Sequence, residues 1–320
     1  STPAFMDYEV VHFIKNRFIK AETMDALEYI AKFFPFEMPQ ITKNGLAIRW
    51  DMLKSKEKIN VRALYAAPFD NTNSDSPNDG MEKSYNEIIH ILELMGKDEM
   101  KKNVFKGAKG FLENEQKPQA SSAVEHLTNL ALTYTSDNPL YVVSIGAITN
   151  VASAILTKPE IVNNIVVVWL GGHSREYKDT NEFNLNEDVA AARVVFSSGA
   201  PVVQLPCFGV VSNFTISNQE LDCWFKGKNA LCDYLVKKTN QEVAKLIDTD
   251  CDWTRILWDV TTIGWLLNDD DRFMYGRIIP IKVPTYERVY SKEESKDLMH
   301  YVYYIKRDEL MRDMIEKLTK

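Results

Sequence analysis

Cysteine is scarce in this sequence, and its spacing excludes two kinds of site. Among 320 residues there are four cysteines, Cys207, Cys223, Cys232 and Cys251. They show neither the Cys-x-x-Cys spacing of zinc and redox motifs nor the density of a secreted disulfide scaffold. We expect ordinary reduced thiols and a cytoplasmic protein.

Long apolar runs and an excess of basic charge are also missing. No apolar run approaches the ~20 residues that a membrane span needs, and the start of the sequence lacks the basic and apolar segments of a signal peptide. Acidic residues outnumber basic ones by 45 to 38, a net charge of −7. A surface for nucleic acid or an anionic membrane needs clustered lysine and arginine. We therefore expect a small polar or neutral ligand, with no nucleic acid and no membrane.

The composition and length suit one large α/β domain. Hydrophobic residues make up 45% of the chain and charged residues 26%, which is enough apolar material to bury a full core. We expect a single domain over residues 1–320, with a helical segment at about 1–36 packed outside the main sheet.

Apolar runs alternate with helical patterns along the middle of the chain. The predicted strands are Val61–Ala67, Leu140–Ile145, Ile165–Leu170 and Pro201–Leu205, and the predicted helices are Glu82–Leu94, Thr149–Leu156 and Asp188–Phe196. This alternation predicts a mainly parallel sheet covered by helices on both faces. From Asn218 to Lys320 we expect mostly helix, with charged linkers near 268–272 and 287–296.

The polar loops of the chain follow the predicted strands. In parallel sheets ligands bind at the carboxyl ends of the strands. These loops are therefore the expected place of a binding site.

Three motifs in one continuous stretch carry a family resemblance. They are SIGAITNVASAI, VVVWLGGH and NEFNLNEDVAAARVVFSSGAPVVQLP, all between Tyr141 and Val210. This stretch resembles the inosine-uridine-preferring nucleoside hydrolases, and weaker likeness runs from about Asn44 to the C-terminus. The resemblance implies a nucleoside hydrolase-like α/β fold, and hydrolysis of the bond between base and ribose with the help of a bound calcium ion.

The resemblance also assigns substrate-binding residues. Glu182 and Asn184 match the ribose-binding pair of the Glu-Phe-Asn segment, and an extended stretch would point both to one side with Phe183 turned away. Asn71 matches an asparagine that reaches a ribose hydroxyl; an ordinary turn asparagine is the alternative. For Glu182 and Asn184 the alternative is a solvated loop.

Asp259 occupies the place of a late calcium-binding aspartate. An aspartate before an apolar helix also suits an N-cap, and both roles can hold together. Ile145, by position, would offer its backbone carbonyl to the metal. Trp258 stands where many members have a histidine proposed to protonate the leaving base, and tryptophan cannot transfer that proton.

The calcium motif of the family is degraded in this sequence. Lys43 and Asn44 stand where the resemblance places a pair of aspartates, and Glu37 could stand near the preceding Asp-x-Asp site. A hard divalent ion needs several oxygen ligands with compensating negative charge. We therefore expect calcium to bind weakly or not at all.

Histidine supplies the remaining acid–base candidates. His173, directly after Gly171-Gly172, is the best candidate proton donor, and a loop histidine without a role is the alternative. His300 could approach the site from the C-terminal helices. The tryptophans and tyrosines read as core or interface residues, with one or two near Trp258 available to sandwich a nucleobase.

These residues lead to a hypothesis and two rivals. The hypothesis is hydrolysis of a nucleoside or related N-riboside by a homo-oligomer, with Glu37, Asp259 and His173 as catalytic candidates. The first rival is a pseudoenzyme that still binds a nucleoside-like ligand or a protein partner, favoured by Lys43 and Asn44. The second is a purely structural subunit, which the polar strand-end loops disfavour.

Overall fold

A five-stranded sheet forms the centre of the part of the chain that this computed structural model describes, residues 59–245 and 252–320. Its strand order is β3-β4-β5-β9-β8, and the bounds are β3 (Leu140–Ser144), β4 (Ile165–Leu170), β5 (Val202–Leu205), β9 (Leu298–Ile305) and β8 (Met274–Pro280). The first four strands run parallel, and β8 pairs antiparallel with β9. The carboxyl ends of four strands thus share one edge.

Two small sheets lie beside the central one. In the first, β1 (Leu64–Tyr65) pairs parallel with β2 (Val104–Phe105), and in the second, β6 (Thr215–Ser217) pairs antiparallel with β7 (Thr254–Ile256). Asn150 ties the end of β1 to the central region: its Nδ2 donates to Ala66 O at 2.9 Å, and its Oδ1 accepts from Ala108 N at 2.9 Å.

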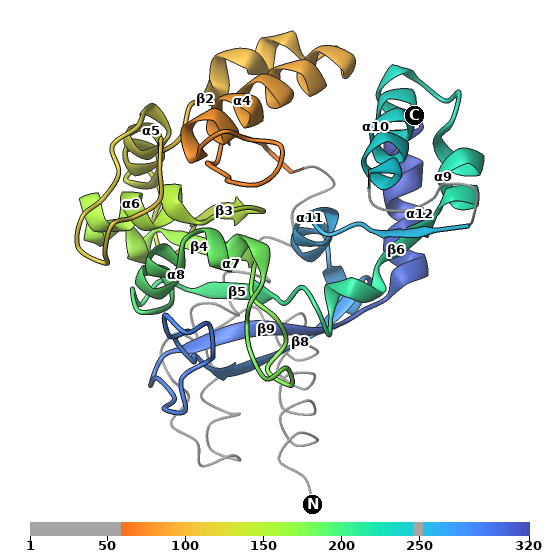
Figure 1. Cartoon of the computed structure of the whole chain (residues 1–320). Helices are drawn as coiled ribbons and strands as arrows, with labels where there is room; N and C mark the ends of the chain where they lie inside the picture. The colour runs from red at the N-terminus through yellow and green to blue at the C-terminus, as the bar shows by residue number, and fades with distance from the viewer. Residues whose placement is uncertain (1–58, 246–251) are drawn as a thin grey trace, which may run out of the picture.

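Helices cover both faces of the central sheet (Figure 1). One face carries α5 (Ser122–Ala131), α6 (Thr149–Thr157) and α8 (Val189–Phe196), and the other carries α11 (Val260–Leu266) and α12 (Arg307–Leu318). Helices α9 (Asn218–Phe225) and α10 (Ala230–Ala244) lie farther from the sheet, and their buried residues belong to the same cluster as those of α11 and α12. The remaining helices are α4 (Pro77–Leu94) and the short α7 (Phe183–Glu187), with 3-10 turns η1 (Asp98–Asn103), η2 (Pro159–Asn163), η3 (Val211–Asn213) and η4 (Asp269–Asp271).

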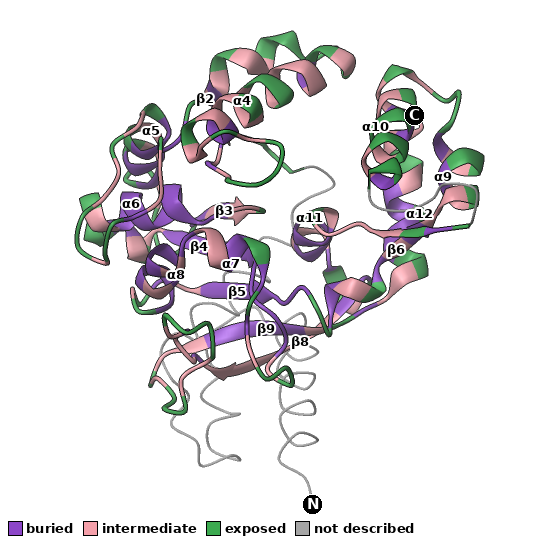
Figure 2. Cartoon of the chain, viewed as in Figure 1, coloured by how far each residue is buried: buried purple, intermediate pink, exposed green. Residues whose placement is uncertain are grey.

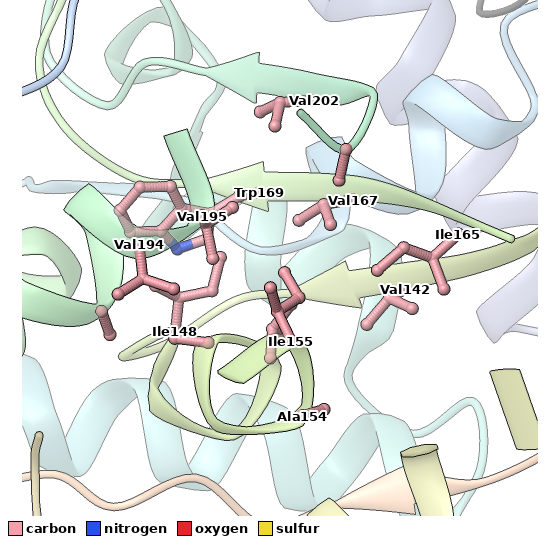
Figure 3. Packing of buried hydrophobic residues seen from close by; sticks show 14 of the residues in the cluster. Val142, Ile148, Ala154, Ile155, Ile165, Val167, Trp169, Val194, Val195 and Val202 are labelled. Carbon is pink, nitrogen blue, oxygen red and sulfur yellow. The ribbon is translucent and has the colours of Figure 1, made fainter. Parts of the chain in front are cut away.

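The central strand β4 is buried at every position. Val167 and Trp169 face one cluster of buried residues, and Val166 and Val168 face the other. Figure 3 shows Val167 packing beside side chains from α6 and α8. Figure 2 shows the central strands β4 and β5 as buried and the outer strands β3 and β8 as mostly intermediate. A strand covered on both faces has to be apolar throughout, which explains the run IVVVWL.

Polar residues fix where several helices begin. Ser76, Ser121 and Asn229 each accept a hydrogen bond from a backbone N–H of the first turn of α4, α5 and α10. Ser217 forms a reciprocal capping box with Glu220 at the start of α9. Such caps satisfy donors that a helix leaves unpaired.

The α/β prediction is confirmed, and the strand Ile165–Leu170 has the bounds that were predicted. The first predicted strand was too long, because only Leu64–Tyr65 of the run Val61–Ala67 pairs with another strand. The helical segment predicted at 1–36 lies outside the described residues. That the whole chain is a single domain stays a prediction.

The prediction of a mostly helical segment from Asn218 onward was wrong. It contains β9, which lies between β5 and β8 in the central sheet. β9 carries His300 and several tyrosines, and the residues of β5 that pair with it lie 97 positions earlier in the sequence, as in the pair Val202 and Met299. Pairing at such a distance leaves no local mark in the sequence.

In the described ranges, no helix has the length and apolar character needed to cross a membrane.

Candidate functional site

The loops that follow β4 and β5 lie side by side at the carboxyl edge of the sheet. Backbone pairing continues beyond the strands, since Cys207 N donates to Gly172 O at 2.8 Å and Ser174 N to Phe208 O at 2.9 Å. This pairing places His173 next to Cys207 and Phe208, as the rule for parallel strands predicts.

Glu182 is buried, with 6% of its surface exposed, and its carboxylate is held by main-chain donors. Oε2 accepts from Gly172 N at 2.9 Å and from Leu185 N at 3.0 Å, and Oε1 accepts from Asn184 N at 2.9 Å. Glu182 is thereby the N-cap of α7 and also binds the loop after β4. These hydrogen bonds fix the position of the carboxylate between α7 and the loop after β4.

Asn184 is buried beside Glu182, and its Nδ2 donates to Leu170 O at the end of β4, at 2.9 Å. The prediction that Glu182 and Asn184 lie on one side with Phe183 turned away is confirmed, since both are buried and Phe183 is exposed. The extended conformation used to reach it was wrong, because Asn184 belongs to the first turn of α7. Capping by Glu182 explains the difference.

Asp259 reaches the same site from the segment after β7. It occupies the N-cap position of α11, but its side chain makes no capping hydrogen bond with the described residues. Although the residue is exposed, surrounding protein desolvates the carboxyl group and the nearby Glu182 charge repels it, and together these raise the pKa of Asp259 to about 6. The capping role proposed for this side chain is therefore not seen.

The thiol of Cys207 lies near both acids and forms a hydrogen bond with Glu182. The residue is buried. Burial, then the charge of Glu182 and a hydrogen bond with it, and last the charge of Asp259, raise the pKa of the Cys207 thiol. At neutral pH Cys207 is a neutral, weak donor beside Glu182, and it is not a nucleophile, because thiol reactivity requires the thiolate.

His173 is buried behind the loop after β5. Phe208 N donates to its Nδ1 at 3.4 Å. Burial lowers the pKa of His173, and the charges of Glu182 and Asp179 oppose that effect. The imidazole is therefore mostly neutral at neutral pH, which makes it a weaker proton donor than an exposed histidine.

Aromatic rings surround His173. Phe208 contacts His173 edge to face at 5.0 Å between centroids and contacts Trp258 at 5.5 Å, with an interplanar angle of 85°. Tyr177 stacks on Phe208 at 6.4 Å. Phe208 and Tyr177 are both exposed. Exposed aromatic faces next to carboxylates are suited to a flat base attached to a polar sugar.

The remaining candidates lie on neighbouring loops. Ile145 follows β3 and is exposed, and the next residue, Gly146, accepts a hydrogen bond from Trp169 Nε1 at 3.1 Å. Asn71 is exposed and forms a turn in which its Oδ1 accepts from Asn73 N at 2.8 Å. That loop is joined to α7, because Asp70 N donates to Glu187 Oε2 at 2.7 Å.

His300 does not come from C-terminal helices, as the sequence suggested. It lies on β9, is buried, and its Nδ1 accepts from Trp265 Nε1 of α11 at 3.3 Å. The ring also fills the space above Gly276, where an added Cβ would lie 2.1 Å from it. His300 is thus packed beneath α11.

The described residues alone do not fit a calcium site. In ranges 59–245 and 252–320 no group of three or more His, Cys, Asp or Glu side chains could hold a metal ion. Glu182 already accepts three main-chain hydrogen bonds, whereas calcium takes six to eight oxygen ligands. Glu37, Lys43 and Asn44 lie outside the described residues.

Sequence reasoning missed Cys207, Phe208 and Tyr177. The first two directly follow β5, so the argument that selected His173 after β4 would also have selected them. Cys207 was instead classed as an ordinary thiol from its spacing alone. Tyr177 lies in a loop, and no pattern in the sequence marks its contact with Phe208.

Comparisons with known proteins agree with this geometry. The family model described as inosine-uridine preferring nucleoside hydrolase matches residues 37–306. The pyrimidine-specific ribonucleoside hydrolase RihA of Enterobacter sp. (strain 638) is 38% identical over 90 residues, 27% of this chain and 28% of that protein. The putative pyrimidine-specific ribonucleoside hydrolase RihB of Shigella boydii serotype 4 (strain Sb227) is 32% identical over 90 residues, 27% of this chain and 36% of that protein. The chain thus matches about a third or less of the length of these relatives.

Solved structures share the fold at low identity. A plant nucleoside hydrolase superposes with a TM-score of 0.62 at 16% identity, covering 88% of this chain and 96% of that one. The purine-preferring ribonucleoside hydrolase from Gardnerella vaginalis gives 0.59 at 18% identity, covering 86% and 94%. The family match extends over most of the sequence, and the fold agrees with it. The chain belongs to the inosine-uridine preferring nucleoside hydrolase family.

Proposed function

We propose that this protein hydrolyses the N-glycosidic bond of a nucleoside or related N-riboside to free base and ribose. One observation supports this most directly: the buried Glu182 and the exposed Asp259 lie near each other at the carboxyl edge of the sheet, and desolvation, together with the charge of Glu182, raises the pKa of Asp259 to about 6. Two carboxylates with different environments suit a reaction through an oxocarbenium-like transition state.

The residues then take distinct roles. Glu182, Asn184 and Asn71 hold the ribose, and the first two are pre-oriented by main-chain hydrogen bonds. Asp259 orients the attacking water and takes its proton, since a base with a pKa near 6 is suited to neutral pH. Trp258 contacts the base.

His173 is the proposed proton donor to the leaving base. Its lowered pKa restricts that role to the protonated minority at neutral pH. Bases that depart without prior protonation should therefore be the better substrates. The relatives named pyrimidine-specific make uridine and cytidine the first compounds to test.

The localisation, oligomeric state and calcium binding of the protein are also proposals. We infer a cytoplasmic homo-oligomer that binds calcium weakly or not at all. Glu37 is a further candidate base, and Asp259, Asn44 and Ile145 are the candidate metal ligands. The support is sequence-based: Cys207, Cys223 and Cys232 are free thiols, and Lys43 and Asn44 replace expected aspartates.

Ribose release from inosine, uridine and cytidine, with calcium and after chelation, tests this function. We expect turnover that falls by at least about 10²-fold in Glu182→Ala, a loss typical of removing a group that positions the reacting substrate. Glu113→Ala, which removes an exposed carboxylate paired with Lys117, is the control and should keep wild-type activity. Ribose affinity from calorimetry should fall with Glu182→Ala alone.

Three outcomes are distinct. Ribose binding without turnover on any substrate would favour the pseudoenzyme. A protein that neither binds ribose nor turns over any of these substrates would be a purely structural subunit. Unchanged ribose affinity in Glu182→Ala would remove Glu182 from the site.

A further inference from the structure

The loop that connects β8 to β9, residues 281–297, contacts the loop that carries His173 and Glu182. We call residues 171–182, which contain Gly172, His173 and Glu182, the site loop. Thr180 N of the site loop donates to Arg288 O at 2.7 Å. The hydroxyl of Tyr290, from the β8–β9 loop, forms hydrogen bonds with His173, Gln204 and Thr180.

The Tyr290 hydroxyl uses its full hydrogen-bonding capacity. It donates to His173 O at 2.9 Å, and it accepts from Gln204 Nε2 at 2.8 Å and from Thr180 Oγ1 at 3.2 Å. A phenolic oxygen has one proton and two lone pairs. Each is used, so the hydroxyl fixes three groups relative to one another.

The same hydrogen bonds lead on to Glu182. His173 N donates to Thr180 Oγ1 at 2.9 Å, and Glu182 N donates to Thr180 O at 2.8 Å. Gly172 N donates to Glu182 Oε2 at 2.9 Å, which closes the site loop. The position of the Glu182 carboxylate thus depends on both ends of a segment that Tyr290 holds together.

Gly172 makes room for this hydroxyl. Its φ is +74°, and a Cβ at this position would lie 2.4 Å from Tyr290 Oη and 2.7 Å from Thr180 Oγ1. Any side chain would displace the hydroxyl. The glycine is required both by its backbone conformation and by the tyrosine that packs against it.

The β8–β9 loop is held in place independently of the site. Arg193 Nη1 of α8 donates to Pro284 O at 2.7 Å, and Tyr286 Oη donates to Glu115 Oε1 at 2.9 Å. Ile281 is buried in the core. Arg288 adopts φ +61°, a conformation that a non-glycine residue keeps only where its surroundings impose it. The loop is therefore a fixed support for Tyr290.

We propose that Tyr290 is a positioning residue for the site: its hydroxyl sets the relative placement of His173 and Glu182, and thereby the binding of ribose. This rests on the proposed function, in which Glu182 holds the sugar. Tyr290 itself touches no reacting group.

Tyr290→Phe tests the proposal, with Tyr286→Phe as the matched control from the same loop. Both variants lose one hydroxyl that is hydrogen-bonded in the structure. We expect Tyr290→Phe to raise KM and to lower kcat/KM by at least tenfold, because ribose-holding contacts contribute binding. Tyr286→Phe should change kcat/KM less than twofold. Melting temperatures of both variants are measured to separate placement from stability.

Amide hydrogen exchange adds a readout that needs no activity. The amide of Gly172, which donates to Glu182, should exchange faster in Tyr290→Phe and at the wild-type rate in Tyr286→Phe. Gly172→Ala is a second variant that should reproduce the rise in KM by displacing the hydroxyl. Gly227→Ala is its control, since Gly227 also has φ +74° but nothing within 4 Å of an added Cβ.

The outcomes separate the two claims. An inactive wild-type protein would contradict the proposed function, and faster Gly172 exchange confined to Tyr290→Phe would then still support the positioning of the loop. An active wild-type protein with unchanged KM and unchanged Gly172 exchange in Tyr290→Phe would overturn the role of Tyr290. Equal losses in both tyrosine variants would also overturn it.

Discussion

The two carboxylates of the site, Glu182 and Asp259, differ in burial and in hydrogen bonding. Glu182 is buried but accepts three main-chain hydrogen bonds. The exposed Asp259 makes no capping hydrogen bond with the described residues, and desolvation of its carboxyl group by neighbouring protein, together with the charge of Glu182, raises its pKa to about 6. Residue type alone says nothing of this difference, which supports the proposed role of Asp259 as the base.

The raised pKa of Asp259 predicts how activity depends on pH. In the proposed reaction ionised Asp259 takes the proton of the water, so kcat/KM should rise as the pH increases through about 6. Asp259→Asn should lose activity by about 10²-fold or more, the usual effect of losing a general base, and should lack this pH limb. The pH–rate profiles of both proteins are the measurement.

The same pKa predicts an effect on stability. A carboxyl group whose pKa is raised by folding favours the folded state while it is protonated, and this contribution is lost as the pH rises from about 4 through 6. Asp259→Asn should therefore melt at a higher temperature than wild type at pH 8 and at a similar temperature at pH 4. A variant that is less stable at pH 8 would contradict the repulsion between Asp259 and Glu182.

At the scale of elements, Asp188 connects three segments that support the site. Its carboxylate caps α8 by accepting from Ala191 N at 2.9 Å, and it also accepts from Leu112 N at 2.9 Å and Thr149 Oγ1 of α6 at 2.7 Å. The residue is 3% exposed. Removing it would leave buried donors without a partner.

Asp188→Ala should destabilise the protein by about 3 kcal/mol or more, since each unpaired buried donor costs about 1–3 kcal/mol. Ser121→Ala, which removes a helix cap alone, should cost about 1 kcal/mol. Urea unfolding of both variants measures the difference. Equal losses would show that the bonds to Leu112 and Thr149 contribute little.

Elements with local signals were predicted, and elements that depend on distant partners were not. β4 and α6 follow from apolar runs and period, and the structure starts both at the predicted residue. β9 was missed, because its residues form a strand only where β5 and β8 pair with it. β1 is short for the same reason, because only two of its residues pair with residues of β2.

For the whole molecule, coverage of the sheet on both faces makes a prediction about stability. Val167 and Val168 point to opposite faces of β4, and each is 0% exposed. Val→Ala at either position should cost about 2–3 kcal/mol, from lost burial and the cavity that remains. Val61→Ala, at a position that is 49% exposed, should change stability by less than about 0.5 kcal/mol. Unequal losses of unfolding free energy at the two core positions would mean that helices cover one face of the sheet less completely than the other.

The sequence alone determined the α/β class, the polar loops at the carboxyl edge and the family motifs around Glu182, because strand runs, helix period and short motifs are local. The tertiary structure decided which loops meet. It brought Cys207 and Asp259 to Glu182 and Phe208 to His173. It also placed His300 beneath α11 and Tyr290 against the site loop. Those contacts join residues far apart in the chain, and their distances, burial and pKa shifts arise only after the sheet has assembled.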